Sequence, residues 1–269
     1  MTNLPILNSI DAIRKQYPTG EEPVLVMCSD MNRYICKYIR SSASVQKLVC
    51  ELIGVKMAEV WGLNVPKAVF VKIRSEHWPS QFTRPKVLTT MLGSKYLEAV
   101  EYVLPSTFSK VAQTFSMFYQ LLKIALFDIW VANEDRNSNN SNLLYDIKNT
   151  RLVPIDFGCI LNSADLESSM MQLTSNETIL SSPLFSHLTQ NISDKKKIEL
   201  RKEYDACLSQ CRLQTNSIIE ELPSDWSVPA EKVSNKLNQL FQPDWAEAVW
   251  NNFEECLKII SKSYEQIKI

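Results

Sequence analysis

Two short stretches near the middle of the chain constrain it more than any other feature. The first is a polar run that begins with Asp135 and contains Asn140, and the second is the Asp-Phe-Gly sequence at 156–158. An apolar segment with helical spacing precedes Asp135, and two short strands around a turn, 143–145 and 152–155, are predicted between the stretches. Such a hairpin would bring the aspartate of Asp-Phe-Gly back beside Asn140. A carboxylate, an amide and a second carboxylate would then lie together.

These polar groups suit phosphoryl transfer from a nucleotide. That reaction needs one side chain that orients the attacking hydroxyl and accepts its proton, and at least two oxygen ligands that hold Mg²⁺ against the nucleotide phosphates. Asp135 can be the base, and Asn140 and Asp156 can be the magnesium ligands. The alternative is structural, because asparagine-rich loops are common turns and Asp-Phe-Gly occurs by chance. The order and spacing of the two stretches together favour the catalytic interpretation.

The composition is compatible with such an enzyme and excludes several other classes of protein. A chain of 269 residues with 45% apolar residues can bury the core of one large domain or of two packed lobes. Its formal net charge of −1 predicts no direct binding of nucleic acid and no attraction to an anionic membrane. Five scattered glycines cannot form a dinucleotide-binding fingerprint or a Walker A loop. The only histidines, His77 and His187, are too far apart in sequence to suggest a metal centre.

The sequence also carries expectations about location and thiol chemistry. The longest apolar run, 124–132, is too short to span a membrane and is interrupted by Asp128. The first thirty residues lack the pattern of a signal peptide, so we expect a cytoplasmic protein that does not bind a membrane. Seven cysteines without a Cys-x-x-Cys pair predict reduced, buried thiols, including Cys207 and Cys211 on one helix face.

The predicted elements divide the chain into a strand-rich first part and a helical second part. Strands are expected at 23–28, 33–39, 68–73 and 86–92, with one helix at 45–61 that ends before Gly62. A long apolar helix is expected from Ser106 to about Ala132, followed by helices at 194–213, 228–241 and 244–266. This pattern predicts an α+β fold.

A lysine in one of these strands is a second candidate functional residue. Lys37 alternates onto the same strand face as Ile35 and Ile39, and a cation on an apolar face requires a partner. Glu51 in the following helix is the expected partner. In protein kinases a strand lysine pairs with a helix glutamate and contacts the α- and β-phosphates of ATP. The alternative is an edge-strand lysine whose amine lies in water.

Together these segments resemble the HipA-like protein kinases, whose best-known members are bacterial persistence-toxin kinases. The resemblance covers most of residues 18–160. It rests on Pro-Val-Leu-Val, Tyr-Ile-Cys-Lys-Tyr, Leu-Val-Cys-Glu-Leu-Ile, Trp-Gly-Leu-Asn-Val-Pro, the Asn-x-Asp-Arg loop and Ile-Asp-Phe-Gly. Val-Cys-Glu-Leu followed by Gly-Leu-Asn-Val-Pro is more specific than Asp-Phe-Gly alone.

The resemblance implies a two-lobed protein-kinase-like fold with ATP between the lobes. The small mixed N-lobe would span residues 1–104, and the larger helical C-lobe would span residues 105–269. The resemblance further implies ATP and Mg²⁺ as cofactors and a serine or threonine of a protein as acceptor. The site residues it implies are Asp135 as catalytic base, Lys37 as phosphate-binding lysine, Glu51 as its partner, and Asn140 and Asp156 as magnesium ligands.

Two positions depart from the family pattern. Asn137 stands where many relatives have histidine, and the phosphate-covering loop lacks a glycine pair, with only Gly20 or the glycine-free turn 29–32 available.

The alternatives to such a protein kinase are a nucleotide-binding pseudokinase, or a kinase-fold enzyme that acts on a small molecule or transfers AMP. A toxin would have an antitoxin-like partner. Relatives also imply autophosphorylation near the nucleotide loop, with Ser29 as the sharper candidate and the 41–44 cluster as the other, Ser44 being the expected helix N-cap.

Overall fold

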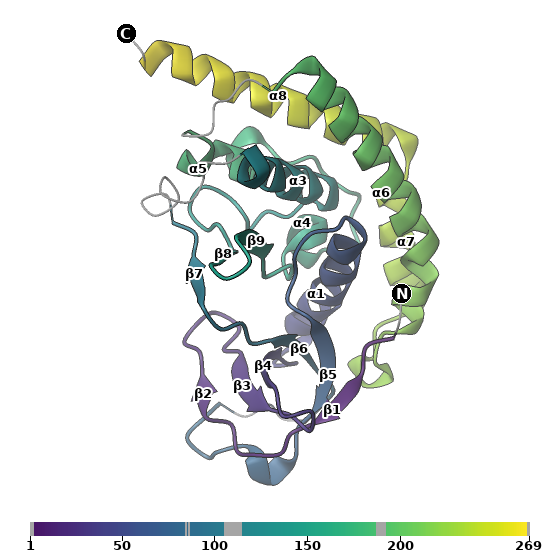
Figure 1. Ribbon diagram of the computed structural model, residues 1–269. Coiled ribbons are helices and arrows are strands. Elements are labelled where there is room, and N and C mark those ends of the chain that lie inside the picture. Colours follow the sequence, from purple (N-terminus) through teal and green to yellow (C-terminus); the bar gives the residue numbers. More distant parts are fainter. Residues whose placement is uncertain (1–2, 84, 86, 105–114, 187–191, 268–269) are drawn as a thin grey trace.

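The computed structural model describes residues 3–83, 85, 87–104, 115–186 and 192–267. These residues form an α+β fold with two sheets and a set of helices that cover one side of the molecule (Figure 1). The strand-rich part comes first along the chain and the helical part follows, as the sequence predicts. The division into lobes at residue 104 remains a prediction.

The first sheet has six strands in the order β1-β5-β6-β4-β3-β2. All neighbouring strands are antiparallel except β1 and β5, which are parallel. The strands are β1 (Ile6–Asn8), β2 (Lys15–Gln16), β3 (Val24–Met27), β4 (Arg33–Lys37), β5 (Ala68–Lys72) and β6 (Met91–Lys95). Because β4 lies between β6 and β3, Lys37 is not on an edge strand, and the edge-strand alternative is wrong.

The alternation of residues along β4 separates the two faces of this sheet. Tyr34 and Cys36 are buried in a cluster that also contains Val24 and Val26, whereas Ile35 and Lys37 point to the other face and are half-buried. At the β5 and β6 end, Ala68, Phe70 and Leu92 join the main core with α1. One face of the sheet therefore packs in this smaller cluster, and the other face, which carries Lys37, packs against the main core at the β5 and β6 end.

Helix α1 (Ser42–Val60) begins with a capping box and ends at a glycine. Ser41 is the N-cap, and Ser44 at the third helical position completes the reciprocal hydrogen bonds. The expectation that Ser44 is the cap is therefore wrong by one turn. Trp61 closes the helix and Gly62 follows with φ of 68°, a backbone conformation that favours glycine.

The second sheet contains three antiparallel strands in the order β7-β8-β9. They are β7 (Val100–Tyr102), β8 (Leu143–Asp146) and β9 (Arg151–Pro154). The predicted hairpin between the Asp135 loop and the Asp-Phe-Gly sequence is thus confirmed as β8 and β9. Strand β7 is short and half-exposed, and the sequence pattern did not indicate it.

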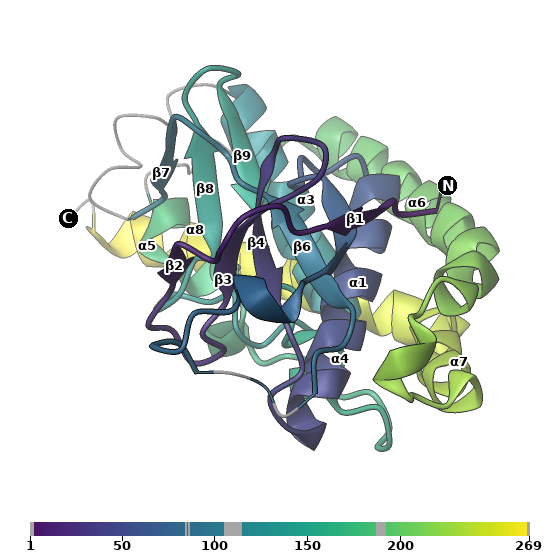
Figure 2. The same cartoon turned by 90° about the horizontal axis from the view of Figure 1, so that it is seen from below.

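The remaining helices form the larger part of the molecule. They are α3 (Phe115–Val131), α4 (Ile160–Ala164), α5 (Pro183–Ser186), α6 (Asp194–Glu220), α7 (Ala230–Leu240) and α8 (Pro243–Ile267), with 3₁₀ helices η1 (Ser75–His77), η2 (Ser175–Glu177), η3 (Ile179–Ser181) and η4 (Ser224–Trp226). Helices α6, α7 and α8 wrap around α1 and α3, and β1 approaches α6 (Figures 1 and 2). The backbone N–H of Leu4 donates to the Glu221 carboxylate at the end of α6.

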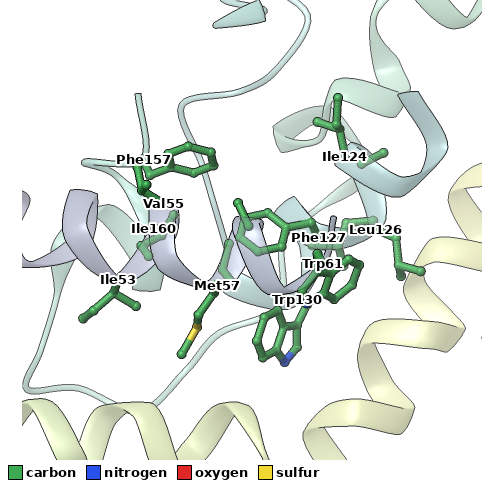
Figure 3. Packing of buried hydrophobic residues seen from close by; sticks show 14 of the residues in the cluster. Ile53, Val55, Met57, Trp61, Ile124, Leu126, Phe127, Trp130, Phe157 and Ile160 are labelled. Carbon is green, nitrogen blue, oxygen red and sulfur yellow. The ribbon is translucent and has the colours of Figure 1, made fainter. Parts of the chain in front are cut away.

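The main core joins α1 to α3 (Figure 3). Trp61 stacks on Trp130 with ring centres 5.4 Å apart and meets Phe127 edge-on at 5.3 Å. Phe127 in turn contacts Phe157 edge-on at 5.9 Å. This aromatic chain fixes the end of α3, and with it the Asp135 loop, relative to α1.

Several boundaries differ from the sequence-based expectations. The fourth strand lies at 91–95 rather than 86–92, because its pairing with β4 and β5 includes Gly93, and α6 is about two turns longer than predicted. The predicted start of the long apolar helix, Ser106, lies outside the described residues, within which the helix spans Phe115–Val131. All seven cysteines are free; Cys159 and Cys207 are half-buried and the others are buried. None of the helices in the described ranges combines the length and apolar character of a membrane span.

Candidate active site

Lys37, at the end of β4, lies among three carboxylates. Its Nζ atom is 2.6 Å from Asp156 Oδ1, 2.9 Å from Glu51 Oε2 and 3.4 Å from Glu21 Oε2. Burial alone would lower the pKa of Lys37, but these carboxylates outweigh it and hold the pKa well above its ordinary value. Lys37 is therefore a charged group held between residues distant in sequence. The predicted Lys37–Glu51 pair is present, and sequence analysis did not identify Glu21.

Glu51 joins α1 to the Asp-Phe-Gly segment as well as to β4. One of its oxygens, Oε2, accepts hydrogen bonds from Lys37 and from the backbone N–H of Phe157 at 2.8 Å. Asp156 has a φ of 61°, a conformation that L-residues adopt only when surrounding contacts impose it. Burial would raise the pKa of Asp156, but the ammonium of Lys37 outweighs it and lowers the pKa, so this carboxylate is ionised.

Gly54 allows α1 to approach the Asp-Phe-Gly segment closely. A Cβ atom at Gly54 would lie 2.3 Å from Cβ and 2.7 Å from Cγ of Phe157, which is fully buried. In Figure 3 the Phe157 side chain lies against this stretch of α1. Only glycine fits here, a requirement that the helical pattern of the sequence does not reveal.

The segment that leads to Asp135 is fixed by a buried ion pair. Arg136 and Asp128 on α3 form a salt bridge with both side chains fully buried, and Arg136 also donates to the backbone carbonyl of Ile155 at 2.7 Å. Burial raises the pKa of Asp128 to about 6, although the guanidinium of Arg136 opposes this. Arg136, the residue after Asp135, is therefore bonded to Ile155, the residue before Asp156. The sequence marked Asp128 only as an interruption of an apolar run.

Asp135 is held by amide side chains from its own loop. Its Oδ2 atom accepts hydrogen bonds from Asn142 Nδ2 at 2.8 Å and Asn140 Nδ2 at 3.2 Å. The side chain of Asn137 accepts hydrogen bonds from the backbone N–H groups of Asn139 and Asn140 and shapes the turn. Asn137 thus has a local structural role that needs no positive charge.

The hairpin returns the Asp-Phe-Gly segment to the loop, and the backbone contact is at Asn142 rather than at the expected Asn140. The backbone N–H of Ile155 donates to the carbonyl of Asn142 at 2.9 Å. Among the described contacts no hydrogen bond joins Asn140 to Asp156 directly. Asn142, which the sequence analysis did not single out, shares the Asp135 oxygen with Asn140.

The oxygen atoms of Asp156, Asn140 and Asn142 are of the kind that a magnesium ion bound with a nucleotide would need. Asp156 presents a carboxylate whose side chain is 39% exposed, and the amides of Asn140 and Asn142 turn their nitrogen atoms toward Asp135. Their carbonyl oxygens remain as hard ligands, the type that Mg²⁺ prefers, with phosphate oxygens and water completing its coordination. Across the described residues no three His, Cys, Asp or Glu side chains form a cluster that could hold a metal without a nucleotide.

A cavity of about 500 Å³ opens beside Lys37. It is lined by residues of the β2–β3 loop, β4 and the start of α1, among them Gly20, Lys37 and Lys47. Val24 pairs with Cys36 beside Lys37, whereas Met27 pairs with Arg33 at the opposite end of the hairpin. The turn 29–32 is therefore remote from Lys37, and the premise that made Ser29 the sharper phosphorylation candidate is wrong. The loop that contains Gly20 lies at the site.

An unusual backbone follows the Asp-Phe-Gly segment. Leu161, Asn162 and Ser163 in α4 have positive φ values of 57–60°. Asn162 stabilises this turn through two hydrogen bonds with the backbone of Met171 and one with Glu134 Oε1 at 3.2 Å. Because Glu134 directly precedes Asp135, the segment after Asp-Phe-Gly is attached to the loop that carries Asp135.

This geometry defines a protein of the kinase type, and the comparisons agree. The family model of the HipA-like kinases matches residues 10–255, so the chain belongs to that family. The crystal structure of the Helicobacter pylori proinflammatory kinase CtkA is similar over 93% of this chain and 99% of that chain, with 12% identity and a TM-score of 0.50. At this identity the likeness shows the fold alone.

Two further comparisons add nothing to this assignment. The open conformation of CtTel1 covers 94% of this chain and 11% of that chain at 12% identity, and its TM-score of 0.31 carries no argument. No curated protein gives a significant sequence match. The family assignment therefore rests on the family model, and the fold assignment on the architecture and its likeness to CtkA.

Proposed function

We propose that this HipA-like kinase is an ATP- and Mg²⁺-dependent protein kinase that phosphorylates serine or threonine. The observation that carries the proposal is the placement of Lys37 between Glu51 and Asp156. These three side chains come from β4, α1 and the segment after β9, and protein kinases use such a group to hold nucleotide phosphates.

Each residue has a distinct role in this proposal. Lys37 binds the α- and β-phosphates, and Glu51 keeps its ammonium in place while also holding the backbone of Phe157. Asp156 and Asn140 are the ligands for magnesium, with Asn142 as a further amide beside Asp135. When bound, Mg²⁺ supplies positive charge that offsets the charge of the phosphates.

Asp135 is the proposed base. It orients the acceptor hydroxyl and takes its proton as the hydroxyl oxygen forms a bond to the γ-phosphorus. The bond between this phosphorus and the oxygen that bridges the β- and γ-phosphates breaks, and ADP leaves. The two amide hydrogen bonds to Oδ2 fix the carboxylate. The other oxygen, Oδ1, is assigned to the acceptor hydroxyl.

Labelled nucleotides distinguish this function from the alternatives. The full chain is incubated with Mg²⁺ and ATP labelled in either the γ- or the α-phosphate, together with a mixture of candidate proteins. Transfer of label from the γ-position alone supports a kinase. Transfer from the α-position alone contradicts it in favour of AMP transfer, and transfer from neither position contradicts it in favour of a pseudokinase.

The acceptor and the biological role form a finer part of the proposal. Family membership favours a protein acceptor, and phosphoamino-acid analysis of the labelled product tests for phosphoserine and phosphothreonine. A label recovered only in a small molecule would contradict the protein acceptor. A toxin role in the cytoplasm with an antitoxin-like partner is the corresponding cellular proposal, tested by whether expression of active protein, but not of Asp135→Asn, arrests growth.

Autophosphorylation is proposed for the serines at the start of α1. Ser41 and Ser44 line the cavity beside Lys37, whereas Ser29 lies at the far end of the β3–β4 hairpin. A phosphate there adds nearly two negative charges and would repel the phosphates of ATP. Intact mass spectrometry and peptide mapping, with Asp135→Asn as the inactive control, should find phosphate within 41–44. An active enzyme without phosphate in that segment would contradict the proposal.

A further inference from the structure

A carboxylate bridges two lysines at the centre of the candidate site. Glu21 lies in the loop between β2 and β3, with Oε2 3.4 Å from Lys37 Nζ and Oε1 3.3 Å from Lys47 Nζ. Lys37 comes from β4, and Lys47 comes from the second turn of α1. The Glu21 side chain is 26% exposed, so the bridge is partly shielded from water. One anion thus holds together cations from two separate elements.

Glu21 also reaches the Asp-Phe-Gly turn. A Cβ atom at Gly158 would lie 3.7 Å from Glu21 Oε1, 3.6 Å from Glu51 Oε2 and 3.4 Å from Asp156 Oδ1. Three carboxylates therefore converge on one point, where like charges repel one another. Two of these carboxylates are fixed in place, because Glu51 accepts a hydrogen bond from the Phe157 backbone and Asp156 belongs to the turn itself. Glu21 belongs instead to the loop before β3.

Lys47 belongs to the same electrostatic environment. Burial alone would lower its pKa, but the neighbouring acidic groups Cys159, Glu21 and Asp156 outweigh this and raise it. No kinase motif of the sequence assigns a role to Lys47. Its position on the cavity wall beside Lys37 gives the site a second cation.

The neighbouring residue Glu22 provides an internal comparison. It pairs with Arg40 at 2.9 Å rather than with the lysines, although it carries the same charge one residue along. Gly20, on the other side of Glu21, has open space around the position of a Cβ atom. The loop is thus tied at Glu22, and the Glu21 side chain can be displaced without breaking that attachment.

We propose that Lys47 is a second phosphate-binding residue and that Glu21 is a built-in competitor that occupies the phosphate position until a magnesium–nucleotide complex displaces it. The inference rests on the proposed function, because it assumes that nucleotide phosphates bind at Lys37. A carboxylate that bridges two ammonium groups makes the same charge-assisted contacts that phosphate oxygens would make. The nucleotide must break these contacts when it binds, so its affinity is lower by the free energy that the contacts contribute.

Calorimetric titration of the full chain with a magnesium complex of a non-hydrolysable ATP analogue tests this. Glu21→Gln should lower the Kd about fivefold, the scale of a partly exposed ion pair. Lys47→Gln should raise the Kd by a similar factor, and adding Glu21→Gln to Lys47→Gln should improve affinity less than it does in the parent. The Kd for adenosine, which has no phosphate, should be the same in all variants.

Glu22→Gln is the matched control, because it removes the same charge from the same loop while its amide oxygen can still accept a hydrogen bond from Arg40, and it should leave the Kd within about twofold. Equal gains in affinity from Glu21→Gln and Glu22→Gln would overturn the inference, because the gain would then come from the lower net negative charge of the loop and not from the Glu21 contacts. An unchanged Kd in Glu21→Gln, in a parent that binds the analogue, would also overturn it. Failure of the parent and every variant to bind would instead contradict the nucleotide site, and thermal unfolding without ligand verifies that each variant is folded.

Discussion

Gly54 in α1 and Phe157 of the Asp-Phe-Gly segment are in such close contact that no side chain fits between them. A Cβ atom on Gly54 would lie 2.3 Å from the Cβ atom of Phe157. The same helix carries Glu51, which binds both Lys37 and the Phe157 backbone. The close approach of α1 therefore sets the distance between Lys37, the proposed phosphate-binding residue, and Asp156, the proposed magnesium ligand.

Gly54→Ala should destabilise the protein and reduce its activity. In an exposed helix this change stabilises by about 1 kcal/mol, but overpacking a core costs roughly 1–3 kcal/mol. We expect a net loss of stability in chemical denaturation and at least a tenfold loss of phosphoryl transfer, because Phe157 and Asp156 must shift. Gly20→Ala is the stability control, since nothing lies within 4 Å of its added Cβ. A more stable, fully active Gly54→Ala would contradict this account.

Arg136→Met should destabilise the fold in a pH-dependent way. The change leaves Asp128 buried without its cation, which costs about 3–5 kcal/mol when the carboxylate is charged. The pKa of Asp128 is already raised to about 6 from 3.8 and should rise further without Arg136. A group whose pKa is raised by folding contributes stability below its unfolded pKa and loses it as pH rises through the folded pKa.

The penalty for Arg136→Met should therefore be larger at pH 7.5 than at pH 5. Chemical denaturation of both proteins at the two pH values measures it. In the parent, the contribution of Asp128 is lost between its unfolded pKa of 3.8 and about pH 6. A penalty that is equal at both pH values would show that Asp128 does not titrate in this window.

Magnesium should be required for stabilisation by ATP. Asp156 and the amide oxygens of the 135–142 loop are hard ligands, and they need phosphate oxygens to complete the coordination of Mg²⁺. At a ligand concentration a hundred times Kd, stabilisation should be about 2.7 kcal/mol. Thermal melts with ATP and Mg²⁺, and with ATP and a chelator, measure the difference. Equal shifts of the melting temperature under both conditions, or the same magnesium dependence in Asp156→Asn, would rule out Asp156 as a magnesium ligand.

Sequence reasoning identified the residues whose partners follow from local patterns. Alternation along β4 placed Lys37 on a half-buried face, and helical spacing placed Glu51 within reach. The β8–β9 hairpin was predictable because both strands and their turn lie close in sequence. The family assignment from these motifs is confirmed over residues 10–255.

The remainder depends on contacts between distant segments. The requirement for glycine at position 54 exists only because Phe157 packs there, and Glu21 becomes part of the site only because its loop folds over Lys37. The Asp128–Arg136 pair joins a helix to a loop, and the sequence pattern does not show such a contact. Asp128 therefore appeared in the sequence only as a charged residue that interrupts an apolar run. Strand β6 began later than expected because pairing with its neighbours, rather than the apolar run, sets its bounds.

The most direct test of the account is phosphoryl transfer from labelled γ-phosphate ATP by the parent, Asp135→Asn and Asp156→Asn. Loss of a positioned base or of a metal ligand should reduce the rate at least roughly a hundredfold in each variant. Denaturation curves must show that both variants keep the fold. The account predicts transfer by the parent and its near-complete loss in both folded variants. Rates within a few-fold of the parent in both would contradict the catalytic assignment.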